Sequence, residues 1–164
     1  MTSTLESAAV QARHGRQIKL YGSDDFAAMR RAGQLVAECL DALAPIVVPG
    51  LPTQAIDDFV LDFALAHDAI PATVNYKGYT KATCTSINHV VCHGIPGEKP
   101  MREGDIVNVD VTLILDGWHG DSSRMYPVGD IPRRAERLIE VTHESMMRGI
   151  ATIKRGSTTG DIGA

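Results

Sequence analysis

The sequence has few cysteines and no long apolar run. Its three cysteines, Cys39, Cys84 and Cys92, are an odd number with no Cys-x-x-Cys pair. This usage favours a reducing compartment over a disulfide framework, so we expect a cytoplasmic protein. No apolar run approaches the roughly 18 residues of a transmembrane helix, and residues 1–16 lack the apolar region of a signal peptide. We therefore expect no membrane partner.

The sequence also lacks an excess of positive charge. Its 164 residues include 16 Lys and Arg against 20 Asp and Glu, which gives a formal net charge of −4. Proteins that bind the DNA backbone present a basic face, so we expect no DNA partner. Hydrophobic residues make up 44% of the chain and charged residues 22%, which is typical of a single globular domain.

Apolar residues recur at helical spacing in three segments of the chain. The first predicted helix begins at an N-cap, Ser23, and ends at Pro45, and the second begins at a cap formed by Thr53. The third is predicted from about residue 133 to residue 154. We expect its inward side to consist of Leu138, Ile139, Thr142, Met146 and Ile153.

Between the second and third helices the pattern changes to β-branched runs separated by Gly and Pro loops. These runs predict strands at residues 82–87, 90–92, 106–115 and 124–128. Two helices, an antiparallel sheet with helices on one face, and a further helix together indicate the α+β class. Residues 1–18 show no periodicity and are expected to be a flexible lead-in, followed by one domain over residues 19–164.

A short repeat suggests that the chain is incomplete. The spacing Gly-x-x-Thr-x-x-Ile occurs at residues 50–56 and again at residues 156–162, an offset of 156 − 50 = 106. Such a short match also arises by chance, so duplication and coincidence both stay open. With duplication, the second copy stops in the first turn of a helix, where natural domains rarely end. We therefore expect the chain to lack a segment of fewer than 106 residues.

Two aspartates are expected to lie close together on one face of a β-hairpin. Along residues 106–115 the odd-numbered positions are all apolar, whereas the even-numbered ones include Asp110 and Thr112. The dipeptide Asp116-Gly117 favours a two-residue type I′ turn, which places Thr112 opposite Asp121. Asp110 and Asp121 then become diagonal neighbours, with Cβ atoms about 7 Å apart or less.

Converging carboxylates repel each other unless a positive group lies between them. A divalent cation or a pair of cations is suitable, because carboxylate oxygens bind Mn, Fe(II), Co or Mg, and Zn together with His. Alternatively, both aspartates lie on a solvated face. His93, where a strand enters a Gly/Pro loop, is either a functional residue or a histidine bound to a backbone carbonyl. His89 and His119 are interpreted as surface residues without a role.

Several stretches of the sequence together match one known family. They are Pro49-Gly50, Asn75-Tyr76-Lys77-Gly78-Tyr79, Ser86-Ile87-Asn88, Val90-Val91-Cys92-His93-Gly94-Ile95-Pro96, Gly104-Asp105-Ile106-Val107-Asn108-Val109-Asp110-Val111-Thr112 and Asp116-Gly117-Trp118-His119-Gly120-Asp121-Ser122-Ser123. On these residues the chain resembles the type I methionine aminopeptidases, over about residues 18–164. The resemblance implies the pita-bread fold, with one αβ half and the start of the second half present here.

The resemblance also implies roles for individual residues. Asp110 matches a bidentate ligand of one metal ion, and Asp121 matches the carboxylate that bridges two ions. His93 matches a catalytic histidine that contacts the substrate near the scissile peptide bond. The positions that match the wall of the methionine pocket are Tyr76, Tyr79 and Cys84.

The implied reaction is metal-assisted removal of an N-terminal methionine, with a preference for small second residues. Two divalent ions are expected (Co, Mn, Fe(II) or Zn). The expected partners are N-terminal Met peptides or nascent chains and also the ribosome, with the complete protein a monomer. The family's other metal ligands, one His and two Glu, lie in a second half without a counterpart here, so the chain alone is expected to be inactive. Two alternatives stay open: a non-catalytic half-domain that acts as a binding protein, and a prolidase-like relative, although prolidases normally carry a large extra N-terminal domain.

Overall fold

The sheet is built around a hairpin of two long strands, β5 (Ile106–Leu115) and β6 (Trp118–Pro127). A computed structural model describes residues 9–11 and 17–164 of the chain. The turn residues Asp116 and Gly117 both have positive φ, 52° and 81°, as a type I′ turn requires. Thr112 lies opposite Asp121, which confirms the predicted register. The predicted strand at residues 124–128 is the end of β6, because the hairpin continues from its turn without a break.

Two shorter strands pair with the other edge of β5, so that β5 lies in the middle of the sheet. They are β3 (Ile70–Pro71) and β4 (Cys84–Ile87), and all pairings are antiparallel. The prediction of a strand at residues 90–92 is wrong. The amide of Val90 donates to the carbonyl of Ile87 in a turn, and Val91 is 93% exposed, so this stretch is a loop.

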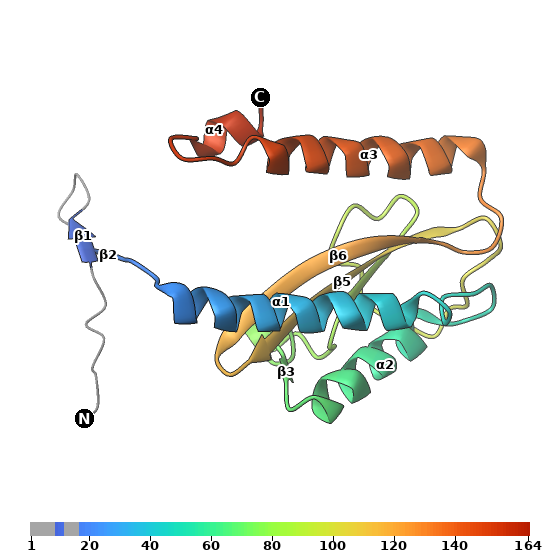
Figure 1. The fold of residues 1–164 in the computed structure, drawn as a ribbon. Helices are drawn as coiled ribbons and strands as arrows, with labels where there is room; N and C mark the ends of the chain where they lie inside the picture. Colours follow the sequence, from blue (N-terminus) through green and yellow to red (C-terminus); the bar gives the residue numbers. More distant parts are fainter. Residues whose placement is uncertain (1–8, 12–16) are drawn as a thin grey trace.

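Helix α1 (Ser23–Leu43) packs against β5 and β6, and helix α2 (Thr53–Ala66) contacts α1 and β3. Both helices lie close to the sheet in Figure 1. The predicted caps are wrong. Gly22 is the N-cap of α1, and its amide donates to the carboxylate of Asp25. Pro52 is the N-cap of α2, while the Thr53 hydroxyl bonds instead to the backbone of Gly97.

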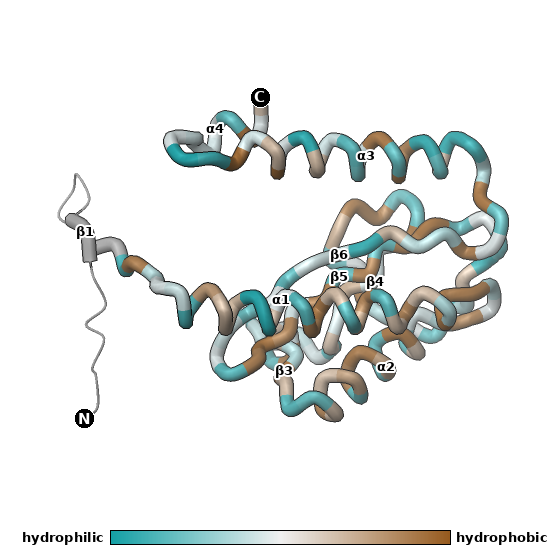
Figure 2. The backbone as a smooth tube through the Cα atoms, in the orientation of Figure 1, coloured by the Kyte–Doolittle hydropathy of each residue, from teal (hydrophilic) through white to brown (hydrophobic). Residues whose placement is uncertain are grey.

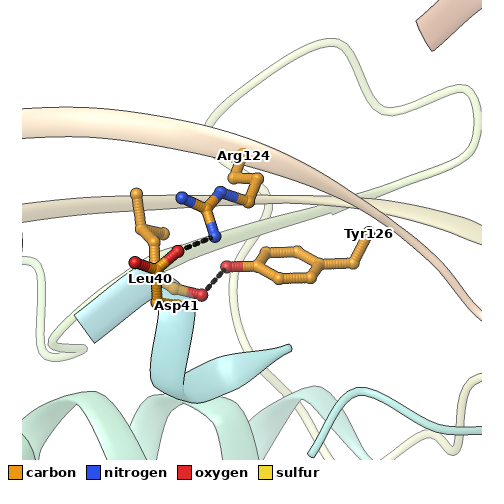
Figure 3. A network of polar contacts seen from close by, with 4 residues as sticks. All are labelled: Leu40, Asp41, Arg124 and Tyr126. Carbon is orange, nitrogen blue, oxygen red and sulfur yellow. Dashed lines mark hydrogen bonds and ion pairs between the residues drawn. The ribbon is translucent and has the colours of Figure 1, made fainter. Parts of the chain in front are cut away.

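The hydrophobic core lies between these helices and one face of the sheet. It unites α1, α2 and the odd-numbered positions of β5, and its fully buried members include Val36, Leu43, Ile56, Val109 and Leu113. Two polar contacts fasten α1 to β6 (Figure 3). The Tyr126 hydroxyl donates to the carbonyl of Leu40 at 2.5 Å, and Arg124 pairs with Asp41 at 2.6 Å. Figure 2 shows apolar segments concentrated in this part of the molecule.

Helix α3 (Arg133–Ala151) differs from α1 and α2 because it buries no residue. The prediction that one side of this helix faces a core is wrong for the described chain, since Leu138, Met146 and Ile153 are all more than half exposed. In Figure 1, α3 and the short helix α4 (Thr159–Ile162) lie away from α1 and α2. The apolar face of α3 has no covering element among the described residues.

The repeat noticed in the sequence has matching local structure. Gly50 and Gly156 both have positive φ, 89° and 94°, and each follows a long helix. Three residues further on, Thr53 and Thr159 are the first residues of α2 and α4. The two copies therefore place the same residue types at the same points of a helix–turn–helix.

The N-terminal stretch expected to be a lead-in falls partly outside the described residues, which omit 1–8 and 12–16. Its described parts are two short strands, β1 (Ala9–Gln11) and β2 (Gln17–Lys19), which pair antiparallel. A search of the described residues finds no helix with the length and apolar character needed to cross a membrane.

Candidate active site

A cavity of about 580 Å³ opens on the polar face of the β5–β6 hairpin, opposite the hydrophobic core. Its walls come from both hairpin strands, from β4, and from the loops around residues 72–79 and 93–95. The lining residues are Ala72, Thr73, Tyr76, Tyr79, Cys84, His93, Ile95, Asp110, Thr112, His119 and Asp121. All six site residues suggested by the sequence therefore line a single cavity.

Asp110 and Asp121 face the cavity as the hairpin register predicts. Asp110 is half-buried, opposite Ser123 of β6 and Cys84 of β4. Burial, and then the negative charge of Asp121, raise the pKa of Asp110 above its ordinary value, while His93 acts in the opposite direction. Asp110 is therefore harder to ionise than an ordinary aspartate.

Asp121 is more exposed and receives a hydrogen bond of 2.9 Å from the hydroxyl of Thr112, its cross-strand partner. Within the described residues, neither Asp121 nor Asp110 takes part in an ion pair with Lys, Arg or His. The hairpin thus holds two carboxylates on one face with no ion-pair partner among the described residues. This is the donor chemistry of a divalent cation site.

His93 is presented to the cavity by a strained loop that lies against β4. Its φ of 55° falls in the left-handed region, which a non-glycine residue adopts at a cost. The next residue, Gly94, holds the loop in place: its carbonyl accepts the amide of Thr85, and its own amide donates to the hydroxyl of Ser86. A Cβ at Gly94 would lie 2.1 Å from the carbonyl oxygen of Thr85, so only glycine allows this approach.

Tyr79 and Cys84 form one wall of the cavity and are joined by a hydrogen bond. The Cys84 thiol lies 3.5 Å from the Tyr79 hydroxyl, which in turn donates to the carbonyl of Thr83 at 2.9 Å. Burial is the main cause that raises the pKa of both groups, so both are neutral at physiological pH. Tyr76 lies at the rim, because its side chain is 63% exposed. This wall is therefore uncharged, unlike the aspartate side.

Sequence reasoning missed two residues of this region. His119 was given no role, yet it lines the cavity two residues before Asp121 on the same face of β6. The alternation of side chains along a strand was a sufficient signal for this placement. No local pattern in α2 indicates a role for Asp57, although its buried carboxylate accepts two backbone amides of the segment that leads into β4.

The two aspartates fit part of a metal site rather than a complete one. Over residues 9–11 and 17–164, no group of three or more His, Cys, Asp or Glu side chains is arranged to hold a metal ion. Two carboxylates with hard oxygen donors nevertheless supply one side of a coordination shell. The arrangement is therefore suited to sharing a divalent cation with ligands from elsewhere.

Comparison with known proteins places this geometry in context. The model of metallopeptidase family M24 matches residues 27–164. The methionine aminopeptidase of Rickettsia prowazekii is 54% identical over 146 residues, which are 89% of this chain and 56% of that protein. Methionine aminopeptidase B of Synechocystis is 54% identical over 142 residues, 83% of this chain and 52% of that protein. The chain thus spans just over half the length of these curated relatives.

Solved structures show the same likeness. The crystal structure of the Rickettsia prowazekii methionine aminopeptidase matches with a TM-score of 0.88 over 89% of this chain and 59% of that one, at 54% identity. The Thermotoga maritima enzyme matches with a TM-score of 0.84 over 88% and 59%, at 36% identity. An Xaa-Pro dipeptidase from Bacillus anthracis matches over 84% and 37% with a TM-score of 0.73, but at 19% identity it shows the fold alone.

Proposed function

This chain belongs to metallopeptidase family M24, and from that premise we propose that the protein is a methionine aminopeptidase. It would hydrolyse the peptide bond after the N-terminal methionine of newly made proteins, with a preference for small second residues. The observation that carries this proposal is the single cavity that joins two unpaired carboxylates, a histidine and an uncharged Tyr–Cys wall. The 54% identity to methionine aminopeptidases, against 19% to the Xaa-Pro dipeptidase, favours methionine as the excised residue.

Asp110 and Asp121 are the residues of this chain that would hold metal. Two divalent ions (Co, Mn, Fe(II) or Zn) are proposed for the complete site, by the resemblance to the family. When bound, such ions lower the pKa of a water molecule and polarise the scissile carbonyl. The raised pKa of Asp110 means that a proton competes with metal for this carboxylate at a higher pH than for an ordinary aspartate.

The other cavity residues bind and orient the substrate. His93 lines the same cavity as Asp110 and would donate or accept a hydrogen bond at the scissile peptide. Tyr79 and Cys84 present an uncharged surface that suits a thioether side chain, and Tyr76 at the rim would cover it. The proposed partners are nascent chains and, with them, the ribosome. We further propose that the complete protein acts as a monomer in the cytoplasm.

The chain taken alone is proposed to be inactive. It contributes two carboxylates, whereas the family resemblance implies five protein ligands, so one His and two Glu would have to come from a second half of the fold. A site with two ligands should bind Mn²⁺ much more weakly than a complete one. This part of the proposal is separable from the family assignment.

The test is Mn²⁺ binding by isothermal titration calorimetry, combined with cleavage of Met-Ala-Ser. We expect weak binding to the chain, above roughly 100 µM, because a partial shell displaces few waters from the ion. Asp110→Asn and Asp121→Asn should abolish it, whereas Asp62→Asn, an exposed aspartate of α2, should leave it unchanged. The native protein from its own cells should cleave Met-Ala-Ser and lose this activity when metal is chelated.

Two results would count against the proposal. Native protein that binds Mn²⁺ but releases no methionine would favour a non-catalytic binding protein instead. Submicromolar Mn²⁺ binding by the 164-residue chain as a monomer would contradict the half-site interpretation, because no group of three or more potential ligands is arranged to hold a metal ion within the described residues.

A further inference from the structure

The carboxylate of Asp57 is a buried charge that the proposed mechanism does not use. Asp57 lies on α2 and is 5% exposed, yet it forms no ion pair with the described residues. One oxygen, Oδ1, accepts the backbone amides of Ala82 at 2.7 Å and Thr83 at 3.1 Å. A buried carboxylate that bonds to two backbone amides far along the chain fixes the position of that segment.

The segment that Asp57 holds is the one from which the cavity wall is built. The carbonyl of Thr83 accepts the Tyr79 hydroxyl at 2.9 Å, and Tyr79 contacts the Cys84 thiol at 3.5 Å. The hydroxyl of Thr83 donates to the backbone carbonyl of Asp110 at 2.5 Å. The short connection from Asp57 through Thr83 therefore reaches both the uncharged wall and the strand that carries a proposed metal ligand.

Neighbouring side chains hold Asp57 in this position. Gln54, one helical turn earlier on α2, donates to its second oxygen, Oδ2, at 3.4 Å. The amide oxygen of Gln54 in turn accepts a hydrogen bond from Lys81, which directly precedes Ala82. Asp57 and Gln54 therefore hold the same segment from two sides, Asp57 through its backbone amides and Gln54 through the Lys81 side chain.

We propose that Asp57 is a positioning residue, which sets the shape of the substrate pocket by fixing residues 82–84 without itself touching the cavity. Asp57 is not among the cavity-lining residues, so any effect it has on binding must pass through this segment. That the pocket holds a methionine side chain rests on the proposed function. The positioning role does not rest on that function, because cysteine alkylation tests it without any measurement of activity.

The three cysteines of the chain provide a direct readout. Cys84 lies in the wall, Cys39 is completely buried in the core, and Cys92 is exposed. Alkylation by iodoacetamide is followed at each cysteine by peptide mass spectrometry over a series of pH values. Because the charge of Asp57 itself contributes to raising the pKa of Cys84, the rates are compared at the high-pH plateau, where the thiol is ionised in every variant. There the Cys84 rate reports the opening of the wall, and the Cys39 rate reports the opening of the core. Cys92 serves as the reference for reagent and pH.

The variant to compare is Asp57→Asn, with Asp58→Asn as its matched control. Asp58 is the next residue of the same helix and also accepts from Gln54, at 2.7 Å, but it is exposed and is not bonded to residues 82–83. We expect Asp57→Asn to raise the alkylation rate of Cys84 about tenfold or more, because it replaces a charge-assisted hydrogen bond by a neutral one. Cys39 should keep its rate, and Asp58→Asn should change neither cysteine.

Two outcomes would overturn the proposal: no change at Cys84, or an equal rise at Cys39 and Cys84, which would show that Asp57 supports the whole fold. If Asp57→Asn does not fold, Gln54→Ala takes its place, since it leaves the carboxylate and its bonds to residues 82 and 83 but removes the hydrogen bonds of Gln54 to Asp57, Asp58 and Lys81. We expect Gln54→Ala to raise Cys84 labelling about two- to threefold with Cys39 unchanged, a smaller rise than for Asp57→Asn because Asp57 keeps its bonds to the amides of Ala82 and Thr83. An unchanged Cys84 rate in this variant would also contradict the positioning role.

The test in the active protein separates the two proposals. If the proposed function holds, Asp57→Asn should raise KM for Met-Ala-Ser more than it lowers kcat, since it disturbs the pocket wall rather than the reacting groups. A protein without aminopeptidase activity in which Cys84 still responds to Asp57→Asn would refute the function and leave the positioning role intact. A fall in kcat with KM unchanged would contradict the positioning role.

Discussion

The two faces of strand β5 perform different tasks with alternate residues of one chain segment. On the face toward α1, Val107, Val109, Val111 and Leu113 are all completely buried. On the other face, Asp110 and Thr112 are half-buried and line the cavity. The first face supplies hydrophobic stabilisation, while the second carries unneutralised charge that lowers stability. A single strand therefore places the groups proposed for chemistry directly opposite completely buried residues of the core.

The largest effect should follow from truncating the core face. Leu113→Ala should lower the free energy of unfolding by about 2–5 kcal/mol, because the completely buried side chain leaves a cavity. Its neighbour Ile114 points to the other face and is half-buried, so Ile114→Ala should cost less, about 1–2 kcal/mol. Urea unfolding followed by the fluorescence of Trp118, the single tryptophan, measures both. Equal losses would show that the two faces of β5 contribute equally to the free energy of unfolding.

The close approach of α1 to the core face should make Gly120 difficult to replace. A Cβ at Gly120 would lie 2.2 Å from the carbonyl oxygen of Ala32 in α1, so the helix would have to move away from β6. Gly120→Ala should therefore lower the free energy of unfolding by about 1–3 kcal/mol. Gly33 of α1 has open space around its own Cβ position, so Gly33→Ala should raise stability by about 0.5–1 kcal/mol. Thermal denaturation of both variants checks the contrast, and a tolerated Gly120→Ala would contradict the packing described.

The hairpin was predictable because its determinants are local. The dipeptide Asp116-Gly117 specifies the turn, and the turn specifies the register that brings Asp110 near Asp121. Identifying the function of the aspartates required more, because a solvated face and a metal site have the same alternating pattern. The family resemblance favours the metal site, and the cavity shows that the aspartates, His93, Tyr79 and Cys84 lie together.

The features that the sequence did not predict depend on contacts between distant segments. The apolar stripe of α3 predicts a buried face, but burial needs a second surface, and none covers α3 among the described residues. Asp57 bonds to amides 25 and 26 residues away, and no local pattern in α2 indicates such partners. His119 is different, since the parity it shares with Asp121 already placed it on the cavity face. The sequence therefore contained enough information to place His119 on the cavity face.

On the cavity face, removing charge should increase stability. Burial and the charge of Asp121 raise the pKa of Asp110 above 3.8, so the folded protein binds this proton at a higher pH than the unfolded chain does. The ionised carboxylate therefore destabilises the fold at neutral pH, and the penalty fades as the pH falls through the raised pKa. Asp110 is only half-buried, so solvent screens part of this penalty. Asp110→Asn should raise the free energy of unfolding at pH 7 by about 1 kcal/mol, and the gain should shrink as the pH approaches 3.8.

Urea unfolding of wild type and Asp110→Asn at a series of pH values measures this gain, with Asp62→Asn on α2 as the control for a plain loss of one exposed charge. A second variant isolates the contribution of the neighbouring aspartate. Asp121→Asn should move the pKa of Asp110 back toward 3.8, as followed by NMR of its carboxyl carbon. A stability gain that is independent of pH would show that the ionised carboxylate of Asp110 does not destabilise the fold.

The smallest effect is expected at Thr85, which tests whether the core face tolerates polarity at all. Thr85 lies on β4 opposite Val109, and its buried hydroxyl finds no hydrogen-bond partner in the described part of the chain. Valine has nearly the same shape and lacks the polar atom, so Thr85→Val should raise the free energy of unfolding by about 0.5–1 kcal/mol. Ser86→Ala on the opposite face of the same strand should have the reverse sign, because the Ser86 hydroxyl accepts the amide of Gly94. If Thr85→Val lowers the denaturation midpoint instead, the core face needs this hydroxyl. The division between an apolar face for stability and a polar face for chemistry would then hold for β5 but not for β4.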